Sequence, residues 1–508
     1  MNTPNGTYKG KMARALLLTA MTTFVLQAAA DDSILYHRQQ YAGACVRYNM
    51  ETFASAPLRS YLPVPSLSEI SVSGFSQPSA TAQLPQLGTG GRFFNVEASS
   101  LQHLGEGNVV WGNASYRNGR KYDVTWSETS DFLQLYPYVL ADGRGGDLKY
   151  EEYRLDGGYS AHKGRVSYGA DLGYRALSEY RDFDPRPNNT VADLYARLGA
   201  GYKLPCGYVV ALTADAGKYK QTNELAYYNE LGAQKEYHLT GIGNDFARFS
   251  GQSNNCFYKG YNLGAELSMA STGGTGWMVQ AGYMYTQREK VLSDLNRLPL
   301  NTLDIHTVRA ALGYNTKQAG ARLSGKYTIR NGTDNLFGDA TGSVYPQIGS
   351  VKQYEAKVLT LAADGYWSLV PSRHLLVDIL PSVAYTSFES DHRSSGNNLD
   401  SHDISFGIRG NMSYIRQSDM LSARAEVARR QNLSSALNLC NSIGSQMTEA
   451  LQDISRYLSH GQTDMSLGAE YTRRIWGDKA ISLGVQWHRS FYLSTGSNRY
   501  EAKVTFTL

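Results

Sequence analysis

The chain has 508 residues, of which 49 are Lys or Arg and 45 are Asp or Glu. Its net charge of +4 is too small to indicate a nucleic-acid partner, and no basic cluster alternates with aromatic residues. The apolar fraction of 42% is ordinary, and past residue 30 no apolar run reaches the roughly 18 residues of a membrane helix. Any segment of the mature chain that crosses a bilayer must therefore be a strand.

The first 30 residues predict a secretory signal peptide. Basic residues precede an apolar run over 15–26, and an Ala-x-Ala cleavage site ends at Ala30. We expect cleavage after Ala30. Residues 31–66 follow without clean alternation, so we expect either a periplasmic tail or a segment folded into a lumen, ahead of a barrel over residues 67–508.

Strict alternation of apolar and polar residues is the main signal along the chain. In the segment 318–331, Arg322, Lys326 and Arg330 lie on one face, and Leu323 and Tyr327 lie on the other. A cation at mid-depth on the lipid face of a barrel costs roughly 2 to 4 kcal/mol. The charged face must therefore line the lumen. Segment 499–508 alternates in the same way, as expected of a final strand that closes onto the first.

Segments of this kind predict an all-β, antiparallel transmembrane outer-membrane β-barrel of 18 strands. An even number places both ends in the periplasm, and short connections alternate with long ones such as 119–147 and 222–255. If the hairpins near 67–103 are split or merged, the count becomes 16 strands. It becomes 14 strands if more of the N-terminal third lies outside the wall. A secreted β-sandwich or β-helix is the alternative fold. The expected strands are 67–78, 92–103, 107–118, 148–161, 164–178, 191–204, 207–221, 256–270, 276–289, 303–315, 318–331, 352–369, 373–389, 402–416, 420–430, 462–475, 479–493 and 499–508.

Residues 434–459 interrupt the strand pattern. Apolar residues from Ile443 to Leu458 recur at three- and four-residue spacing, which predicts an amphipathic helix in an external loop. The helix could cover the mouth of the barrel or lie on its rim without a gating role.

Four cysteines offer no CxxC spacing, so a structural zinc site is not expected. Export permits disulfides. The strand assignment places Cys256 and Cys440 on the outer side and Cys45 and Cys206 on the periplasmic side. Both pairings stay open, as does the alternative of four unpaired thiols.

Charged residues on the expected inner face are the first group of candidate site residues. Cations outnumber carboxylates, which favours an anion-preferring channel or a site for an acidic solute. The alternative is a ladder of ion pairs that stiffens a filled lumen. The candidates are Arg322, Lys326, Arg330, Arg409, Arg424, Glu426, Arg430, Glu470, Glu501 and Lys503.

Residues 107–204 contain a series of short motifs: WSET at 126–129, LYPYV at 135–139, GGDL at 145–148, GGYS at 157–160, two YR pairs and DPRP at 184–187. In this order and spacing the mature chain resembles an uncharacterised family of outer-membrane β-barrel proteins from Bacteroidota, a domain of unknown function. The resemblance implies outer-membrane residence and no established activity. Its plan is also loosely similar to that of long-chain fatty-acid transporter barrels, but their N-terminal hatch motif has no match here.

The motif residues supply a second group of candidates in external loops: Trp126, Tyr136, Tyr138, Asp184 and Arg186. The aromatic residues could pack a loop against the rim, and the DPRP sequence suits a rigid hairpin tip. The alternative is a binding surface for a ligand or partner.

The leading functional hypothesis is passage or uptake of a small solute across the outer membrane, alone or beside a larger uptake system. A TonB-dependent receptor or a surface lipoprotein is the expected partner, besides the outer-membrane lipids. The second hypothesis is a non-conducting scaffold for lipoproteins or secretion components, and the third is a membrane-embedded hydrolase. The sequence shows no GxSxG, HExxH or nucleotide motif, so we expect no enzyme, no catalytic residues, no cofactor and no metal.

Overall fold

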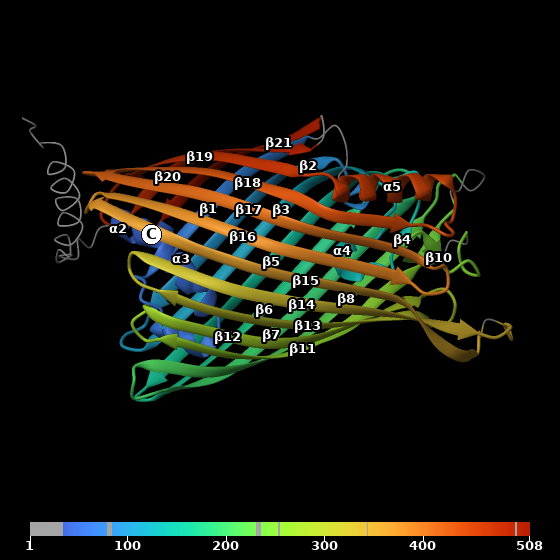
Figure 1. Ribbon diagram of the computed structural model, residues 1–508, viewed down its shortest axis with the longest axis horizontal. Helices are drawn as coiled ribbons and strands as arrows, with labels where there is room; N and C mark the ends of the chain where they lie inside the picture. The colour runs from blue at the N-terminus through green and yellow to red at the C-terminus, as the bar shows by residue number, and fades with distance from the viewer. Residues whose placement is uncertain (1–33, 79–83, 230–234, 252–254, 343, 493–494) are drawn as a thin grey trace, which may run out of the picture.

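The computed structural model describes residues 34–78, 84–229, 235–251, 255–342, 344–492 and 495–508. The expected signal peptide, residues 1–30, lies outside the described residues. In this part of the chain, none of the helices is long and apolar enough to cross a bilayer. Strands dominate and run side by side along the long axis of the molecule (Figure 1).

Within the described residues, eighteen strands form one continuous antiparallel sheet. Each wall strand pairs with the next wall strand along the chain; β3 therefore pairs with β5 and β8 with β11, because the short strands β4, β9 and β10 lie outside the wall. The wall strands are β1 (Leu67–Pro78), β2 (Gly90–His103), β3 (Asn108–Val124), β5 (Gly146–Lys163), β6 (Val166–Tyr180), β7 (Arg186–Lys203), β8 (Tyr208–Ala226), β11 (Cys256–Ser271), β12 (Gly276–Leu292), β13 (Leu298–Asn315), β14 (Ala319–Phe337), β15 (Gln347–Ser372), β16 (Leu375–His392), β17 (Asn397–Arg416), β18 (Asp419–Asn438), β19 (Gln462–Arg474), β20 (Ala480–Tyr492) and β21 (Thr495–Thr507).

The last strand closes the sheet into a barrel. Strand β21 pairs with β1, with Val504 opposite Val72, as well as with β20. Over the described residues, closure leaves no unpaired edge in the barrel wall, which a lipid environment requires. The predicted antiparallel barrel and its count of 18 strands are confirmed over the described residues; the 16- and 14-strand assignments, the sandwich and the β-helix are excluded.

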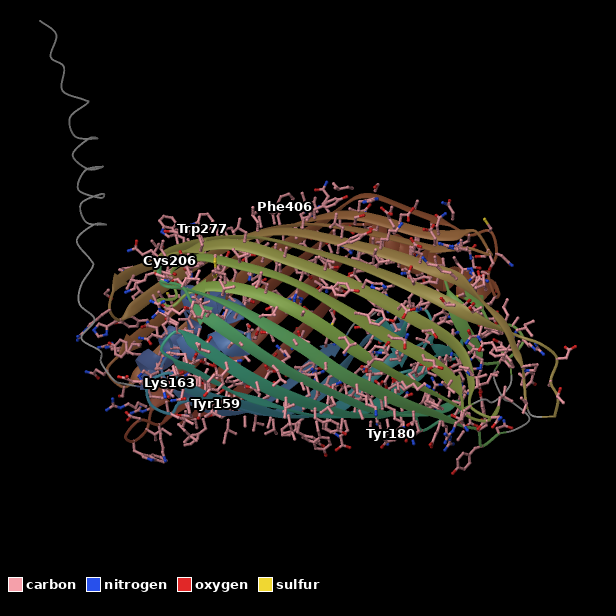
Figure 2. The ribbon with its side chains drawn as sticks, turned by 90° about the horizontal axis from the view of Figure 1, so that it is seen from below. Tyr159, Lys163, Tyr180, Cys206, Trp277 and Phe406 are labelled. Carbon is pink, nitrogen blue, oxygen red and sulfur yellow. The ribbon has the colours of Figure 1, made fainter. Side chains whose placement is uncertain are left out.

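Large apolar side chains cover the outside of the barrel. Tyr159, Trp277 and Phe406 project from the wall away from the lumen (Figure 2), and each is at least 40% exposed in the isolated chain. Leu323 is 62% exposed and follows Arg322, whose side chain faces inward. This period-two pattern gives the wall a lipid-compatible exterior and a polar interior, so the barrel fits a bacterial outer membrane.

Several strands extend beyond the predicted limits at one end. Strand β3 continues to Val124, β8 to Ala226 and β18 to Asn438, each past the last clearly alternating residue. Here both faces of a strand contact water or folded loops, so hydrogen bonding continues although the apolar–polar alternation is lost. The long connections all lie at this end of the barrel. Three other connections at the same end, 181–185, 293–297 and 393–396, are short.

Two further groups of elements lie inside or over the ends of the barrel. The N-terminal group occupies the end with short turns, and the other elements gather at the end with long connections (Figure 1). The first group is α2 (Ile34–Ala42), α3 (Ala44–Thr52) and η1 (Ala56–Tyr61). The second group is η2 (Pro85–Leu87), α4 (Phe132–Leu135), β4 (Leu140–Ala141), β9 (Tyr237–Gly241), β10 (Asn244–Asp245) and α5 (Ser445–Ser459), with β4, β9 and β10 forming a small sheet.

Candidate functional site: the occluded lumen

The N-terminal elements α2, α3 and η1 close the lumen at the short-turn end; we call them the inner closure. Arg38 of α2 donates to Glu470 on β19 at 3.0 Å, and Gln39 donates to Ser413 on β17 at 3.1 Å. The backbone N–H of Ala44 in α3 donates to Asp378 on β16 at 2.9 Å. These contacts reach wall strands far away in the sequence, so they fix the closure across the lumen.

Two inward-facing glycines let η1 approach the wall closely. A Cβ atom on Gly169 of β6 would lie 2.5 Å from the carbonyl carbon of Ala56, and one on Gly199 of β7 would lie 2.8 Å from Cδ of Pro57. Side chains at these positions would force the closure away from the wall. The barrel wall is therefore shaped to receive η1.

The connection 125–145 closes the opposite end together with β9, β10 and α5; we call this group the outer closure. Its centre is a buried apolar cluster in which Trp126, Leu135 and Leu140 pack with inward residues of the wall and with Met447 and Leu451 of α5. Ring contacts extend it, with Tyr136 packed edge-on to Tyr354 of β15. Both ends of the lumen are thus filled by folded protein among the described residues.

Cations on the wall bind the backbone of the outer closure. Arg330 of β14 donates to the carbonyl oxygens of Leu133, Gln134 and Tyr136 at 2.7 to 2.9 Å, and Lys290 of β12 donates to that of Val139 at 3.1 Å. A hydrogen bond from a charged donor is stronger than one between neutral groups, more so where water is excluded. These wall cations position the loop instead of lining an open pore.

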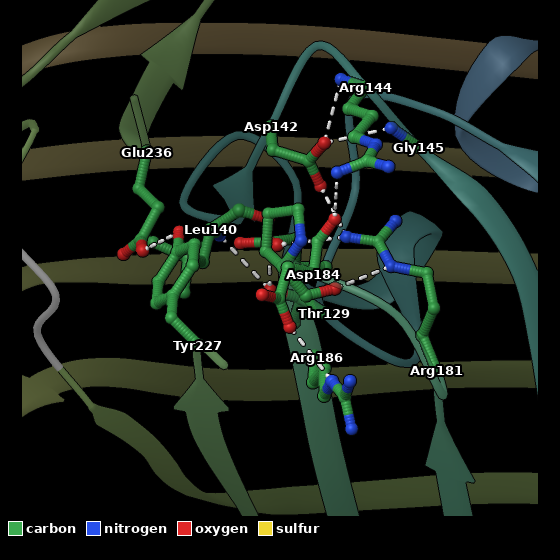
Figure 3. A network of polar contacts seen from close by, with 12 residues as sticks. Thr129, Leu140, Asp142, Arg144, Gly145, Arg181, Asp184, Arg186, Tyr227 and Glu236 are labelled. Carbon is green, nitrogen blue, oxygen red and sulfur yellow. Dashed lines mark hydrogen bonds and ion pairs between the residues drawn. The ribbon is translucent and has the colours of Figure 1, made fainter. Parts of the chain in front are cut away.

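A buried ion-pair cluster joins the outer closure to the β6–β7 hairpin (Figure 3). The Arg181 guanidinium lies 2.8 Å from Asp142 and 3.2 Å from Glu128, and all three side chains are at most 1% exposed. Burial raises the pKa of Glu128, and repulsion from Asp142 raises it further. Burial also raises the pKa of Asp142, but Arg181 and its hydrogen bonds outweigh that effect, so the net pKa is lowered. The pair therefore carries one negative charge opposite one arginine.

Glu236 should make the outer closure more stable in mild acid than at alkaline pH. Its carboxyl accepts a hydrogen bond from Tyr227, and burial together with Asp142 raises its pKa from 4.5 to about 7. A raised folded-state pKa gives a contribution that is full below the unfolded value and lost as the pH rises through about 7. This change in the pKa of Glu236 corresponds to about 3 kcal/mol in the free energy of unfolding of the outer closure. The protection of residues 125–145 against hydrogen exchange, corrected for the intrinsic pH dependence of amide exchange, should therefore be lower at about pH 8 than at about pH 5.

The variant Glu236→Gln cannot ionise and should show a smaller pH effect than the wild-type chain. Glu449→Gln is the matched control, because Glu449 is exposed on α5. Equal pH dependence of exchange in Glu236→Gln and in the control would contradict the assignment.

Two of the external-loop candidates, Asp184 and Arg186, lie at the tip of the β6–β7 hairpin. Asp184 accepts hydrogen bonds from the backbone N–H groups of Tyr228 and Asn229 and from Arg186, and these bonds lower its pKa. The Arg186 guanidinium stacks over the Tyr228 ring at 3.8 Å. Trp126 and Tyr138 are buried within the barrel mouth, each at most 5% exposed. Four of the five candidates thus connect loops to one another, whereas the Tyr138 side chain lies against Gly332 of β14.

Two chambers lie among the described residues of the lumen. The β18 chamber, of about 370 Å³, lies between α2, α3 and strands β16–β21; the β14 chamber, of about 340 Å³, lies between the inner closure and strands β7–β15. Volumes of this size match the lower range of small-molecule sites.

The predicted lumen residues divide between the two chambers and the closures. Arg322 and Lys326 line the β14 chamber, and Arg330 and Arg430 donate to closure carbonyls. Arg409 forms a two-pronged ion pair with Glu426, with N–O distances of 2.8 and 3.0 Å. The β18 chamber is lined by the remaining four, Arg424, Glu470, Glu501 and Lys503.

Histidines near serine and carboxylate groups bear on the hydrolase alternative. His488 Nε2 lies 3.1 Å from Ser490 Oγ, but that hydroxyl donates to Asp464 at 2.5 Å, and Asp464 lies 3.8 Å from the same His488 nitrogen. In a catalytic triad the carboxylate instead binds the far nitrogen of the base. His306 and His402 bond to Tyr283 and Tyr385.

The four cysteines are free thiols in the structure. In the described part of the chain, no group of three or more His, Cys, Asp and Glu side chains is arranged to hold a metal ion.

Sequence reasoning missed the residues that hold the closures. Arg181, Glu128 and Asp142 lie near or within the quoted motifs, and the neighbouring WSET and YR sequences were the available signal. Arg47 of α3, which also lines the β18 chamber, belongs to the segment without alternation. Nothing in its local sequence indicates a lumenal position.

Comparison with known proteins gives a family and distant barrel structures. The model of a "Family of unknown function (DUF6850)" matches residues 55–508. No protein with a curated description matches the chain. Among solved structures, the ferric preacinetobactin receptor BauA from Acinetobacter baumannii is 9% identical over 87% of this chain and 80% of its own, with a TM-score of 0.44.

Two further solved structures are similar at the same level. The monoaromatic hydrocarbon channel CymD is 9% identical over 90% of this chain and 92% of its own, with a TM-score of 0.31. A bacterial polysaccharide outer membrane secretin is 10% identical over 87% and 98%, with a TM-score of 0.35. At these values the similarities carry no argument about function.

Proposed function

Because the chain belongs to the DUF6850 family, whose function is unknown, we propose from its geometry that it is a gated outer-membrane barrel for the passage of a small solute. The observation that carries the proposal is the pair of lumenal chambers, each lined by the inner closure and the wall, in a barrel whose other end is covered by the outer closure. A solute crosses only when the closures move aside.

The inner closure is a segment separate from the wall strands. It is joined to the wall through hydrogen bonds and ion pairs, such as Arg38 with Glu470 and Ser55 with Thr213, the latter at 2.8 Å, and through buried apolar contacts such as those of Leu58 in the cluster with Trp111. Each neutral hydrogen bond contributes about 1 kcal/mol, and the buried apolar contacts add to this, so displacement of the closure requires a partner or solute that compensates for both. A TonB-dependent receptor or a surface lipoprotein is the partner class to be sought by pull-down from detergent extracts.

A reversible cross-link between closure and wall tests the proposal. In a chain whose native cysteines are replaced by serine, Ser55→Cys and Thr213→Cys place two thiols where hydroxyls now meet. In vesicles prepared with any co-purifying partner, solute-driven swelling should occur when the pair is reduced and stop when it is oxidised. Ser68→Cys with Ser100→Cys is the matched control, because these hydroxyls meet at 2.7 Å within the wall.

Swelling that is identical in the oxidised and reduced closure variants would reject gating by this segment. Swelling absent from both, with a stoichiometric partner present, would favour the non-conducting scaffold. The filled outer closure is the observation that keeps the scaffold as the second candidate.

A further inference from the structure

The two lumenal chambers differ in how their arginines are compensated. In the β14 chamber, Arg197 lies 3.2 Å from Asp171, Arg309 lies 2.5 Å from Glu266, and Arg322 pairs with Glu51 and with Asp364. Each of these three guanidinium groups thus has a carboxylate partner. In the β18 chamber, two arginines have none among the described residues.

In the β18 chamber, Arg47 and Arg424 are the two arginines that form no ion pair with a described carboxylate. Arg424 donates through Nε to Asn411 at 3.2 Å, and its other N–H groups make no further hydrogen bond to described residues. The side chain of Arg47 in α3 makes neither a hydrogen bond nor an ion pair with the described part of the chain. Both side chains line the same chamber, one from the closure and one from the wall.

The carboxylates of the β18 chamber are already engaged. Asp378 accepts from the Ala44 backbone N–H at 2.9 Å and from Ser368 at 2.6 Å. Glu470 pairs with Arg38, and Glu501 pairs with Arg499 at 3.1 Å. Lys503 adds a further cation, 4.0 Å from Glu97. Partly buried cations repel one another. Among the described side chains, Arg47 and Arg424 therefore lack a negatively charged group that would compensate them.

We propose that the β18 chamber is a binding site for a small organic anion, whose carboxylate or phosphate oxygens bridge Arg47 of the inner closure and Arg424 of the wall. The proposal deepens the proposed function, because it names the class of solute. An amide nitrogen adds a donor: Nδ2 of Asn411 is buried and has no hydrogen-bond partner in the described structure. Guanidinium groups suit such oxyanions because their N–H groups form paired hydrogen bonds.

The rest of the chamber limits the ligand. Ala42, Leu376 and Met420 contribute apolar surface beside the arginines, and the volume is about 370 Å³. A small anion with a short apolar body fits these features. The electrostatics agree, since burial lowers the pKa of Arg47, and repulsion from Arg424 and Arg409 lowers it further, which outweighs the opposing attraction of Asp378.

Because the anion would contact both α3 and the wall, it would also connect the moving closure to β18. Binding would therefore bias the position of the inner closure, as a ligand does when it binds one conformation better than another.

Isothermal titration of the full-length mature chain in an uncharged detergent at low ionic strength tests the site. Succinate and inorganic phosphate are the anionic probes, and putrescine and sorbitol are the cationic and neutral controls. We expect at least one anion to bind and both controls to fail. Succinate alone would identify a carboxylate site, phosphate alone a phosphate site, and both a general oxyanion site.

Removing either arginine should weaken anion binding. Arg47→Gln and Arg424→Gln should each bind about tenfold more weakly. Arg424→Lys, which keeps the charge, should retain part of the affinity. Lys326→Gln is the matched control, because Lys326 lines the other chamber. Heat-modifiable migration in gels verifies folding, and Lys503→Gln replaces any arginine variant that does not fold.

Absence of binding by both anions would overturn the inference, as would equal losses in Lys326→Gln and Arg424→Gln. The test is independent of the vesicle experiment. Anion binding without swelling would reject solute passage and keep the site, whereas swelling without anion binding would reject the site and keep passage.

Discussion

Arg181→Met is expected to destabilise the outer closure by about 3 to 5 kcal/mol, because it leaves the single buried negative charge of the Glu128–Asp142 pair without its partner. The methionine fills much of the vacated volume but cannot donate to either carboxyl. Hydrogen exchange in residues 125–145 should increase strongly while exchange in the wall strands stays unchanged. The same variant should also raise the apparent pKa of the remaining carboxyl pair, so that acid partly restores protection.

Arg186→Met supplies the matched control for that change. Arg186 lies on the same hairpin and pairs with Asp184 at 2.8 Å, but its side chain is 32% exposed. Ion pairs near the surface contribute about 0 to 1 kcal/mol, so exchange in the closure should change little. If both variants have the same effect, the buried cluster does not anchor the closure.

Leu323→Arg is expected to destabilise the membrane-inserted barrel by about 2 to 4 kcal/mol. Leu323 is 62% exposed on the outer face of β14, so the new guanidinium would face lipid chains. Reversible urea unfolding of the barrel in vesicles, followed by tryptophan fluorescence, measures the change.

Ser324→Arg is the matched control, because Ser324 is the next residue on the same strand and therefore lies at nearly the same depth. Its side chain, however, lines the β14 chamber on the inner face. Its new arginine reaches a polar chamber and should cost less than the arginine at 323. A larger cost at 324 than at 323 would reverse the assignment of the two faces.

The sequence by itself predicted the membrane-spanning part of the wall because one local rule governs every residue of that part. Neighbouring side chains on a strand face opposite sides, and lipid permits almost no charge, so the alternation of Leu323 with Arg322 repeats around the barrel. The strand number and the antiparallel order follow from counting such segments. Strand ends near Val124 and Ala226 were underestimated, because outside the bilayer no rule separates the two faces.

The helix at 445–459 also followed from a local period, whereas its place over the barrel mouth did not. Met447 and Leu451 bury an apolar stripe against β4, β9 and the wall, and those partners come from distant parts of the chain.

Only the tertiary structure decided what fills the lumen. The sequence assigned Arg330 and Arg424 to the same inner face, but one donates to loop carbonyls and the other faces a chamber beside Arg47. Strand periodicity reports which side of the wall a side chain occupies. What it meets there depends on segments such as 34–61 and 125–145, which fold back across the barrel through long-range contacts that leave no periodic trace in the sequence.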